Sequence, residues 1–300
     1  MRAVSLLFHD VFLRDPAESG FNSPGADRYK LSLTAFEAQL AGVARSRSDA
    51  PILASDLSGA SDSDDLRFLI TVDDGGVSYY TVMAERLEAR GWRGHCFVTT
   101  NQIGQSGFLT PAQIRELDAR GHVIGSHSAS HPKRFSTCSP AQMQAEWRDS
   151  RQALEDILGH AVNTASVPGG YYSKAVARAA SNAGIDVLFT SEPTDRLWAE
   201  RDCLLAGRFT IRHGAPGNMS ARFLTPAPWT RLAAGASWKG KALVKPLLGP
   251  WYWRVADRLL ARRVPRATDA LWPPGGADPS MLLGVPERSR RQRTRPTSAG

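Results

Sequence analysis

Residues 67–76 read RFLITVDDGG, an apolar run followed at once by two aspartates and two glycines. The β-branched and aromatic residues of the run predict a buried strand over residues 67–72. In parallel α/β folds, functional side chains gather where strands end, which is where Asp73 and Asp74 lie. A continuing strand would point them to opposite faces, whereas a glycine turn lets both approach one point. An ordinary Asp-Gly turn is the alternative.

Short apolar runs alternate with helical patterns over most of the first 225 residues. This alternation predicts an α/β fold with a parallel sheet or barrel. The expected strands are Val4–Phe8, Pro51–Ala54, Arg67–Val72, His95–Val98, His122–Ser126, Thr164–Val167, Asp186–Thr190 and Leu205–Ile211. The expected helices are Leu33–Ala44, Ser78–Arg90, Pro111–Arg120, Pro140–Leu158 and Lys174–Ala183.

The composition is that of a soluble globular protein, with 42% hydrophobic and 22% charged residues in a chain of 300. No apolar stretch is long enough to cross a bilayer. The N-terminal MRAVSLLFHDVF is interrupted by His9 and Asp10, and it reads as a first strand rather than a signal peptide. Three scattered cysteines without metal-type spacing favour a reduced compartment. We therefore expect a cytoplasmic location.

Positive charge is concentrated at the C-terminus. Residues 226–300 contain 14 Lys and Arg against 4 Asp and Glu, whereas residues 1–225 contain 23 against 25. Over residues 226–264 a helical period of apolar residues predicts an amphipathic helical extension. Its apolar stripe consists of Leu248, Trp251, Tyr252, Val255 and Leu259, with Arg254, Arg258 and Arg262 elsewhere on the helix.

The extension has two interpretations that the sequence leaves open. In the first, the extension lies on an anionic membrane surface, and the protein is peripheral at the inner membrane face. In the second, it packs against the main domain. Residues 265–300 are dominated by Pro, Gly, Ser and Arg, which predicts a disordered basic tail. We expect no specific nucleic-acid partner for this tail.

A histidine pair follows the strand expected at residues 122–126. His127 and His131 in GHVIGSHSASHP are four residues apart, so on a helical turn both rings face the same way and can bind one metal ion. Two histidines and a carboxylate with one open position form a common catalytic zinc set. A surface turn rich in Ser and His is the alternative.

A third strand end carries SVPGGYYS, residues 166–173. Gly169 and Gly170 allow a ligand to approach the backbone, and nearby N–H groups are candidates to stabilise an oxyanion. An ordinary turn between a strand and a helix would look the same. Tyr171 and Tyr172 either stack on a sugar ring or pack inside the protein.

Together these residues resemble the NodB-like polysaccharide deacetylases, carbohydrate esterase family four. The family pattern T-F-D-D-G appears as Thr71-Val72-Asp73-Asp74-Gly75, H-[ST]-x-x-H as His127-Ser128-Ala129-Ser130-His131, and R-x-P-x-G as Ser166-Val167-Pro168-Gly169-Gly170. The resemblance implies a distorted (β/α) barrel over residues 1–225 and metal-dependent removal of acetyl groups from N-acetylated glycans.

The resemblance also implies a role for each matching position. Asp73 would be the general base, and one divalent metal ion, expected to be zinc, would be held by Asp74, His127 and His131. The substrate and its oxyanion would meet a third group of residues, Pro168, Gly169, Gly170 and Tyr171.

Two departures from the family pattern bear on the mechanism. Ser166 stands where the family has an Arg that braces the base, and Arg208 in AGRFTIR is the candidate replacement. The family's late L-x-H histidine is matched poorly by His213. The opening SLLFHDV instead resembles permuted deacetylases of exopolysaccharide systems, in which a strand-end histidine near the N-terminus is the general acid. That position here is His9, for which a purely structural role is the alternative.

The leading hypothesis is a deacetylase of poly- or oligosaccharides or of a lipid-linked glycan. A related hydrolase of linear or cyclic amides, and a catalytically weak barrel that binds glycan, are the alternatives.

Overall fold

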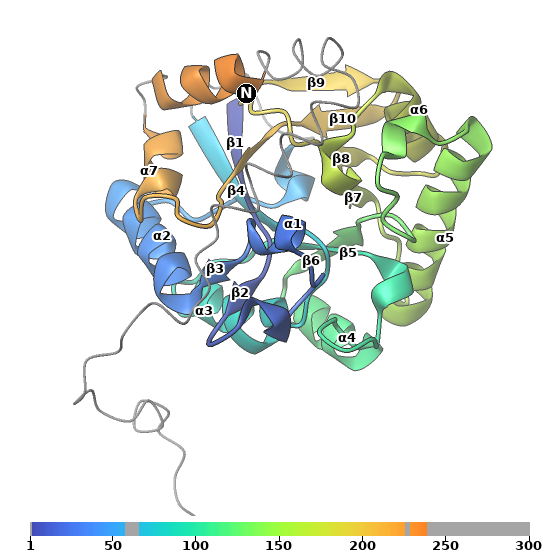
Figure 1. The fold of residues 1–300 in the computed structure, drawn as a ribbon. Helices are drawn as coiled ribbons and strands as arrows, with labels where there is room; N and C mark the ends of the chain where they lie inside the picture. The colour runs from blue at the N-terminus through green and yellow to red at the C-terminus, as the bar shows by residue number, and fades with distance from the viewer. Residues whose placement is uncertain (1, 58–65, 226–228, 239–300) are drawn as a thin grey trace, which may run out of the picture. The chain divides into compact units, whose positions relative to one another are not determined.

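The computed structural model describes residues 2–57, 66–225 and 229–238. Strands occupy the centre of the molecule and helices surround them (Figure 1). The central sheet has nine strands in the order β11-β1-β4-β5-β6-β7-β8-β10-β9. Their bounds are β1 Arg2–Phe8, β4 Leu66–Val72, β5 His95–Val98, β6 Val123–Ser126, β7 Thr164–Ser166, β8 Val187–Phe189, β9 Leu197–Glu200, β10 Cys203–Ala206 and β11 Arg208–Thr210.

Seven α-helices lie among the described residues between 24 and 224, together with a small parallel pair of strands, β2 (Val11–Phe12) and β3 (Leu31–Ser32). A π-helical segment, Tyr79–Met83, leads directly into α3. The helices are α1 Pro24–Asp27, α2 Leu33–Ser46, α3 Ala84–Glu88, α4 Pro111–Ala119, α5 Pro140–Leu158, α6 Lys174–Asn182 and α7 Met219–Leu224.

The strands of the central sheet are parallel, except that β9 runs antiparallel to β10. β10 pairs with β8, and β11 pairs with β1. Because Gly207 alone separates β10 from β11, the chain passes directly from one side of the sheet to the other. This is the α/β architecture of a distorted barrel, and the carboxyl ends of its parallel strands converge on one region.

Most of the expected elements are confirmed, and α5 coincides with its expected bounds. The strand expected at Pro51–Ala54 is wrong, because a short 3₁₀ helix occupies Ala54–Leu57. The carboxylate of Asp56 accepts the Leu53 N–H at 2.8 Å, which satisfies the backbone locally. The strand expected at Leu205–Ile211 is divided in two at Gly207. β9 was not expected, because its side chains are only partly buried and carry a weak pattern.

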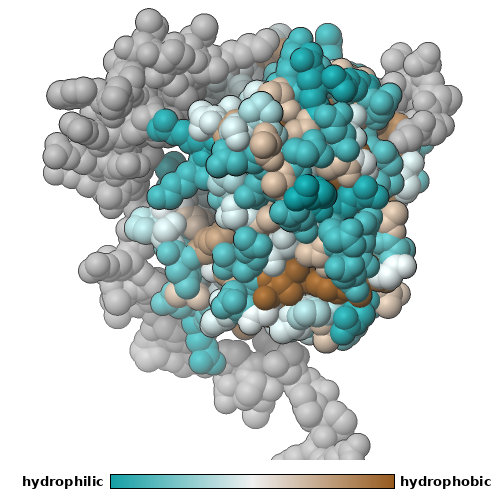
Figure 2. All heavy atoms as spheres, turned by 90° about the vertical axis from the view of Figure 1, so that its right-hand side faces the viewer, coloured by the Kyte–Doolittle hydropathy of each residue, from teal (hydrophilic) through white to brown (hydrophobic). Residues whose placement is uncertain are grey.

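Helix α5 illustrates how sequence produces packing. Its N-cap Ser139 and Gln142 form a capping box, and Gly159 ends the helix with φ 77°. The side chains of Met143, Trp147, Ser150 and Leu154 are buried, at helical spacing. The outer face of this side of the molecule is mainly hydrophilic, with one compact hydrophobic patch (Figure 2).

The C-terminal prediction is described only in part. Residues 229–238 are helical, and Arg231 within them pairs with Asp195 at 3.0 Å. The apolar stripe expected around Trp251 and the basic tail lie outside the described residues. Among the helices that the structure describes, none has the length and apolar character needed to cross a membrane.

Candidate active site

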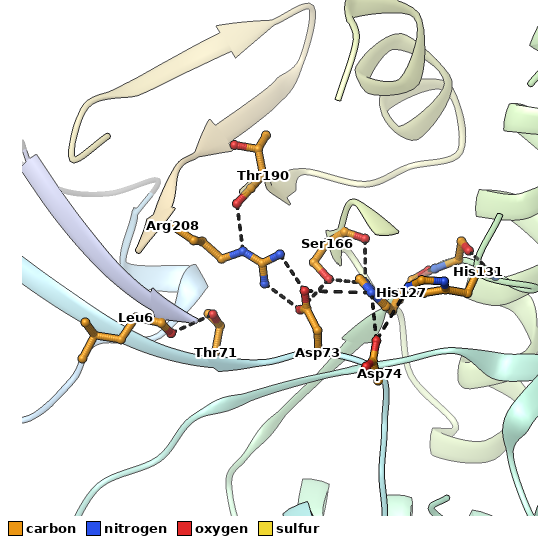
Figure 3. A network of polar contacts seen from close by, with 11 residues as sticks. Leu6, Thr71, Asp73, Asp74, His127, His131, Ser166, Thr190 and Arg208 are labelled. Carbon is orange, nitrogen blue, oxygen red and sulfur yellow. Dashed lines mark hydrogen bonds and ion pairs between the residues drawn. The ribbon is translucent and has the colours of Figure 1, made fainter. Parts of the chain in front are cut away.

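The two aspartates leave β4 in different directions. The Asp73 N–H donates to the carbonyl oxygen of Phe8 at 3.1 Å, so Asp73 begins its turn beside the end of β1. Asp74 and Gly75 both have left-handed backbones, with φ 79° and 78°. Strained non-glycine residues of this kind cluster at functional sites. The turn places both carboxylates on one buried site (Figure 3).

A second buried carboxylate network supports this turn from behind. Oδ1 of Asp10 accepts hydrogen bonds from the hydroxyls of Ser19 at 2.5 Å and Ser78 at 2.9 Å. A Cβ on Gly76 would lie 1.8 Å from that same Oδ1, so only glycine fits there. Burial raises the pKa of Asp10 to about 6, because the desolvated charge is disfavoured. The network ties the segment after β1 to the turn after β4.

The two predicted histidines converge, but not on a helical turn as expected. Residues 127–131 form an irregular loop in which Ser128 and His131 have positive φ, 62° and 56°. Serine side chains hold this loop: Ser126 Oγ accepts the Ser128 N–H, and Ser128 Oγ accepts the His131 N–H, each at 3.1 Å. The imidazole rings of His127 and His131 end with their centres 5.1 Å apart.

Asp74 and the two histidines offer ligand atoms that lie within 4.8 Å of one another. Oδ1 of Asp74 is 3.4 Å from Nε2 of His127 and 3.7 Å from Nε2 of His131. Burial opposes ionisation of Asp74, yet the hydrogen bond from His127 and the nearby histidines lower its pKa. Burial and the adjacent His127 lower the pKa of His131, so its ring is neutral at neutral pH. A carboxylate and a neutral imidazole are the states that a metal ion requires, so these residues fit one.

Ser166 orients one of these candidate ligands. Its hydroxyl donates to Oδ1 of Asp73 at 2.9 Å and lies 2.6 Å from Nδ1 of His127. Because the hydroxyl hydrogen is committed to Asp73, the serine oxygen accepts from Nδ1–H of His127. With Nδ1–H held in this way, a metal ion would replace the proton on Nε2 of His127, the nitrogen that faces Asp74. This is the outer-shell hydrogen bond that metal-binding histidines usually make.

Arg208 lies beside Asp73, as the sequence suggested it would. Its Nη1 and Nη2 donate to the two carboxylate oxygens of Asp73 at 2.6 and 2.7 Å, and its Nε donates to the Thr190 carbonyl at 2.8 Å (Figure 3). The Arg208 side chain is fully buried. Burial opposes ionisation of Asp73, but the Arg208 and His127 charges outweigh it and hold the Asp73 pKa well below its usual range. Asp73 is therefore ionised.

His9 lines a cavity together with Asp73 and Asp74, whereas His213 does not line it. The His9 ring packs against Tyr29 with ring centres 4.8 Å apart, and its buried Nδ1 has no hydrogen-bond partner among the described residues. Burial lowers the pKa of His9, so its ring is neutral at neutral pH in the free protein. His213 is exposed and lies 3.4 Å from the Lys30 carbonyl through Nδ1.

A cavity of about 500 Å³ contains Asp73, which is the expected base, the candidate metal ligands and His9. Gly169 and Gly170 also line it, whereas Pro168 is buried and Tyr171 is not part of the wall. The Gly170 N–H donates to Val167 O at 3.3 Å, which leaves the Gly169 N–H as the candidate oxyanion donor. Tyr172 packs against the Trp198 ring instead of facing the cavity.

Sequence reasoning missed several residues of the cavity wall. They come from the segment before α1, from loops and from the C-terminal helix, where no motif marked them. They are Phe21, Tyr29, Lys133, Arg212 and Trp238. Phe21 packs against His131 with ring centres 5.1 Å apart.

The fold resembles solved deacetylase structures at low sequence identity. The Streptococcus pyogenes deacetylase PplD in complex with acetate is 19% identical, with a TM-score of 0.58 over 75% of this chain and 96% of that chain. IcaB from Ammonifex degensii is 22% identical, with a TM-score of 0.58 over 78% and 97%. These matches agree with the distorted barrel fold.

Sequence comparisons reach the same family. The chain is 30% identical over 125 residues to YxkH of Bacillus subtilis, covering 42% of this chain and 44% of that protein. It is 32% identical over 92 residues to a chitin deacetylase of Pestalotiopsis, covering 31% and 30%. The match therefore spans less than half the length of either relative. Residues 61–188 match the polysaccharide deacetylase family model, so this part of the chain is similar to polysaccharide deacetylases.

Proposed function

We propose that this protein is a metal-dependent hydrolase that removes acetyl groups from the N-acetylated sugars of a poly- or oligosaccharide or of a lipid-linked glycan. The observation that carries the proposal is the single cavity that brings together an ionised carboxylate, a three-residue ligand set and a histidine. The match to the family model and the names of the relatives support the same reaction class.

Zinc is the metal that we propose for Asp74, His127 and His131. Two imidazole nitrogens and one carboxylate oxygen, with further positions open, form a set that Zn²⁺ commonly occupies in hydrolases. A bound zinc ion would polarise the acetyl carbonyl and lower the pKa of a bound water molecule.

The residues of the chain then supply positioning and proton transfer. Asp73, held in one orientation by Arg208 and Ser166, accepts a proton from the attacking water molecule. The Gly169 N–H stabilises the oxyanion that forms on the acetyl carbonyl. His9 delivers a proton to the sugar nitrogen as the C–N bond breaks. Because burial lowers its pKa, the ring is neutral in the free protein and takes up this proton from solvent as negative charge develops beside it, while the proton accepted by Asp73 returns to solvent when acetate leaves. The products are acetate and an amine.

The burial of the ligand set argues against the glycan-binding alternative. Asp74 and His127 are almost completely buried, and the described ion-pair partners of the Asp74 carboxylate are two histidines. A bound metal ion would offset the cost of desolvating that carboxylate, and glycan binding alone would not require one. Hydrolysis of a small amide uses the same machinery, so substrate choice separates that alternative from the glycan reaction.

The test measures metal content and acetate release with the full chain. We expect about one zinc ion per chain and acetate release from N-acetylglucosamine oligomers in excess of release from small linear and cyclic amides. His131→Ala is expected to lose both metal and activity. His160→Ala, which removes an exposed histidine paired with Asp118 away from the cavity, is expected to keep both. Full activity and metal content in Asp74→Ala would overturn the proposal, and preferred turnover of small amides would move the function to that class.

A further inference from the structure

We propose that the active-site cavity contains an anion-binding subsite formed by Arg212, with Lys133 as a second cation, and that the N-acetylated substrate carries a phosphate or carboxylate group. This inference rests on the proposed deacetylase function and names the chemical class of its substrate. Both side chains belong to the cavity wall.

The backbone on both sides of Arg212 is held in place. The N–H of Ile211 donates to the carbonyl oxygen of Leu7 at 2.9 Å, and the N–H of His213 donates to the carbonyl oxygen of Arg28 at 2.9 Å. The position of Arg212 is therefore set by β1 and by the segment that leads into β3.

The Arg212 side chain lies close to the proposed proton donor. Its guanidinium carbon is 5.3 Å from the centre of the Tyr29 ring, and that ring centre is 4.8 Å from the centre of the His9 ring. Tyr29 thus spaces the cation from His9, and a cation–π contact favours the position of the guanidinium group. These two distances place the guanidinium carbon no more than about 10 Å from the centre of the His9 ring, so a group bound by Arg212 would lie in the same cavity as the proposed proton donor.

The positive charges of Arg212 and Lys133 are not neutralised by a carboxylate within the described part of the protein. Neither side chain forms an ion pair with a carboxylate there, although Arg212 contacts Tyr29. The nearby cations are committed: Arg208 to Asp73, and Lys30 to Asp27 at 3.4 Å.

The negative charge of the cavity wall is already compensated. Its carboxylates, among the described residues, are Asp73 and Asp74. Asp73 is neutralised by Arg208, and Asp74 belongs to the metal ligand set. With a divalent ion in place, the cavity is net positive. Such a field attracts an anionic substrate and disfavours a glycan that already carries protonated amines.

The chemistry that fits Arg212 is planar, two-point recognition of an oxyanion. A guanidinium group offers parallel N–H donors that match either a phosphate or a carboxylate. A phosphate would come from a sugar phosphate, a nucleotide-linked sugar or a lipid-linked sugar, and a carboxylate from a uronic acid in a polymer. The experiment has one substrate for each of the two anions.

The test compares kcat/KM of the zinc-loaded full chain on three acetylated substrates: neutral di-N-acetylchitobiose, N-acetylglucosamine 1-phosphate, and a disaccharide of glucuronic acid and N-acetylglucosamine. We expect at least one anionic substrate to be preferred over the neutral one by roughly tenfold, the effect of a charge-assisted pair. The preference should weaken with added salt. Arg212→Gln should remove most of this ratio, and Lys133→Gln part of it.

Arg115→Gln is the matched control. Arg115 is an exposed arginine on α4 that is not in the cavity wall, and its loss changes the net charge by the same amount. We expect this variant to keep the wild-type ratio. A second arm measures binding of glucose 1-phosphate against glucose, which have no acetamide group, by calorimetry. The wild type should bind the phosphate more tightly, and Arg212→Gln should not.

The outcomes separate the two proposals. Equal kcat/KM values for all three substrates, or a ratio that survives in Arg212→Gln, would overturn the anion subsite while leaving deacetylation intact. No acetate release from any substrate, with selective binding of glucose 1-phosphate that depends on Arg212, would overturn the proposed function and leave the subsite standing. Preference for the phosphate or for the uronic acid identifies the source of the anion.

Discussion

Arg208 donates hydrogen bonds to both carboxylate oxygens of Asp73, although the two residues are 135 positions apart in the chain. The guanidinium group comes from β11 and reaches the end of β4 across the intervening β1. Ser166, at the end of β7, completes the contact from the other side by donating to the same aspartate. The cation keeps Asp73 ionised, and together with the hydroxyl it fixes the orientation of the carboxylate.

Removal of the Arg208 charge should lower both the stability of the fold and the activity. Arg208→Leu leaves the buried Asp73 charge unpaired, which should lower the free energy of unfolding by about 3–5 kcal/mol. Denaturant unfolding and acetate release would measure both effects. Arg178→Leu serves as the control, because Arg178 is exposed and its pair with Glu200 should be worth about 1 kcal/mol or less. Equal destabilisation by the two variants would contradict this account of Arg208.

Ser166→Ala should weaken both metal binding and the fold. The variant loses the closer of two acceptors for Nδ1–H of His127. The Ser166 carbonyl oxygen, 3.1 Å from Nδ1, remains and still favours the metal-binding tautomer, so zinc affinity should fall by about tenfold. The fold should lose only about 1–3 kcal/mol. Competition with a chromophoric chelator measures the affinity. Ser139→Ala, which removes an exposed N-cap hydroxyl of α5 outside the cavity wall, is the control for stability and should keep the zinc affinity of the wild type.

Asp10 should make stability depend on pH in a direction opposite to most carboxylates. Its pKa is raised from 3.8 to about 6, so the folded state holds this proton more tightly than the unfolded state. The stability that the proton provides is present at low pH and is lost as pH rises through about 6.

Asp10→Asn cannot titrate, and the other carboxylates are common to both proteins. The unfolding free energy of the wild type relative to Asp10→Asn should therefore fall by up to about 3 kcal/mol between pH of about 4 and about 7. Parallel stability curves for the two proteins across this range would show that Asp10 has an ordinary pKa.

Gly76→Ala should destabilise the turn that carries both aspartates. The added Cβ would meet Oδ1 of Asp10 at 1.8 Å, and the carboxylate is held by two serines, so the expected loss is about 1–3 kcal/mol. Gly25→Ala is the matched control, because the nearest atom to its Cβ would be a serine oxygen at 3.7 Å. Thermal unfolding compares the two variants. A Gly76→Ala protein as stable as Gly25→Ala would show that the Asp10 carboxylate moves aside at little cost.

The membrane contact, the cytoplasmic location and the basic tail stay predictions. The first and last depend largely on residues beyond 238, outside the described part of the chain.

The sequence by itself determined the elements and the ligand candidates, because both depend on short-range patterns. Strand β5 and helix α5 follow from local periodicity and capping, and they appear with the expected bounds. Asp74, His127 and His131 follow strand ends, and parallel topology brings strand ends together. The helical turn expected at the histidines was wrong, because serine hydroxyls within the loop offered a local alternative to helical hydrogen bonds.

Only the tertiary structure decided which distant side chains complete the site. The contact of Arg208 with Asp73 depends on the chain crossing at Gly207, and the cavity wall depends on how loops such as that carrying Phe21 fold over the strand ends. No local period encodes these placements, since each results from packing between segments far apart in sequence. The sequence therefore identified the candidate reacting residues, and the fold determined which side chains hold them and which charges line the cavity around them.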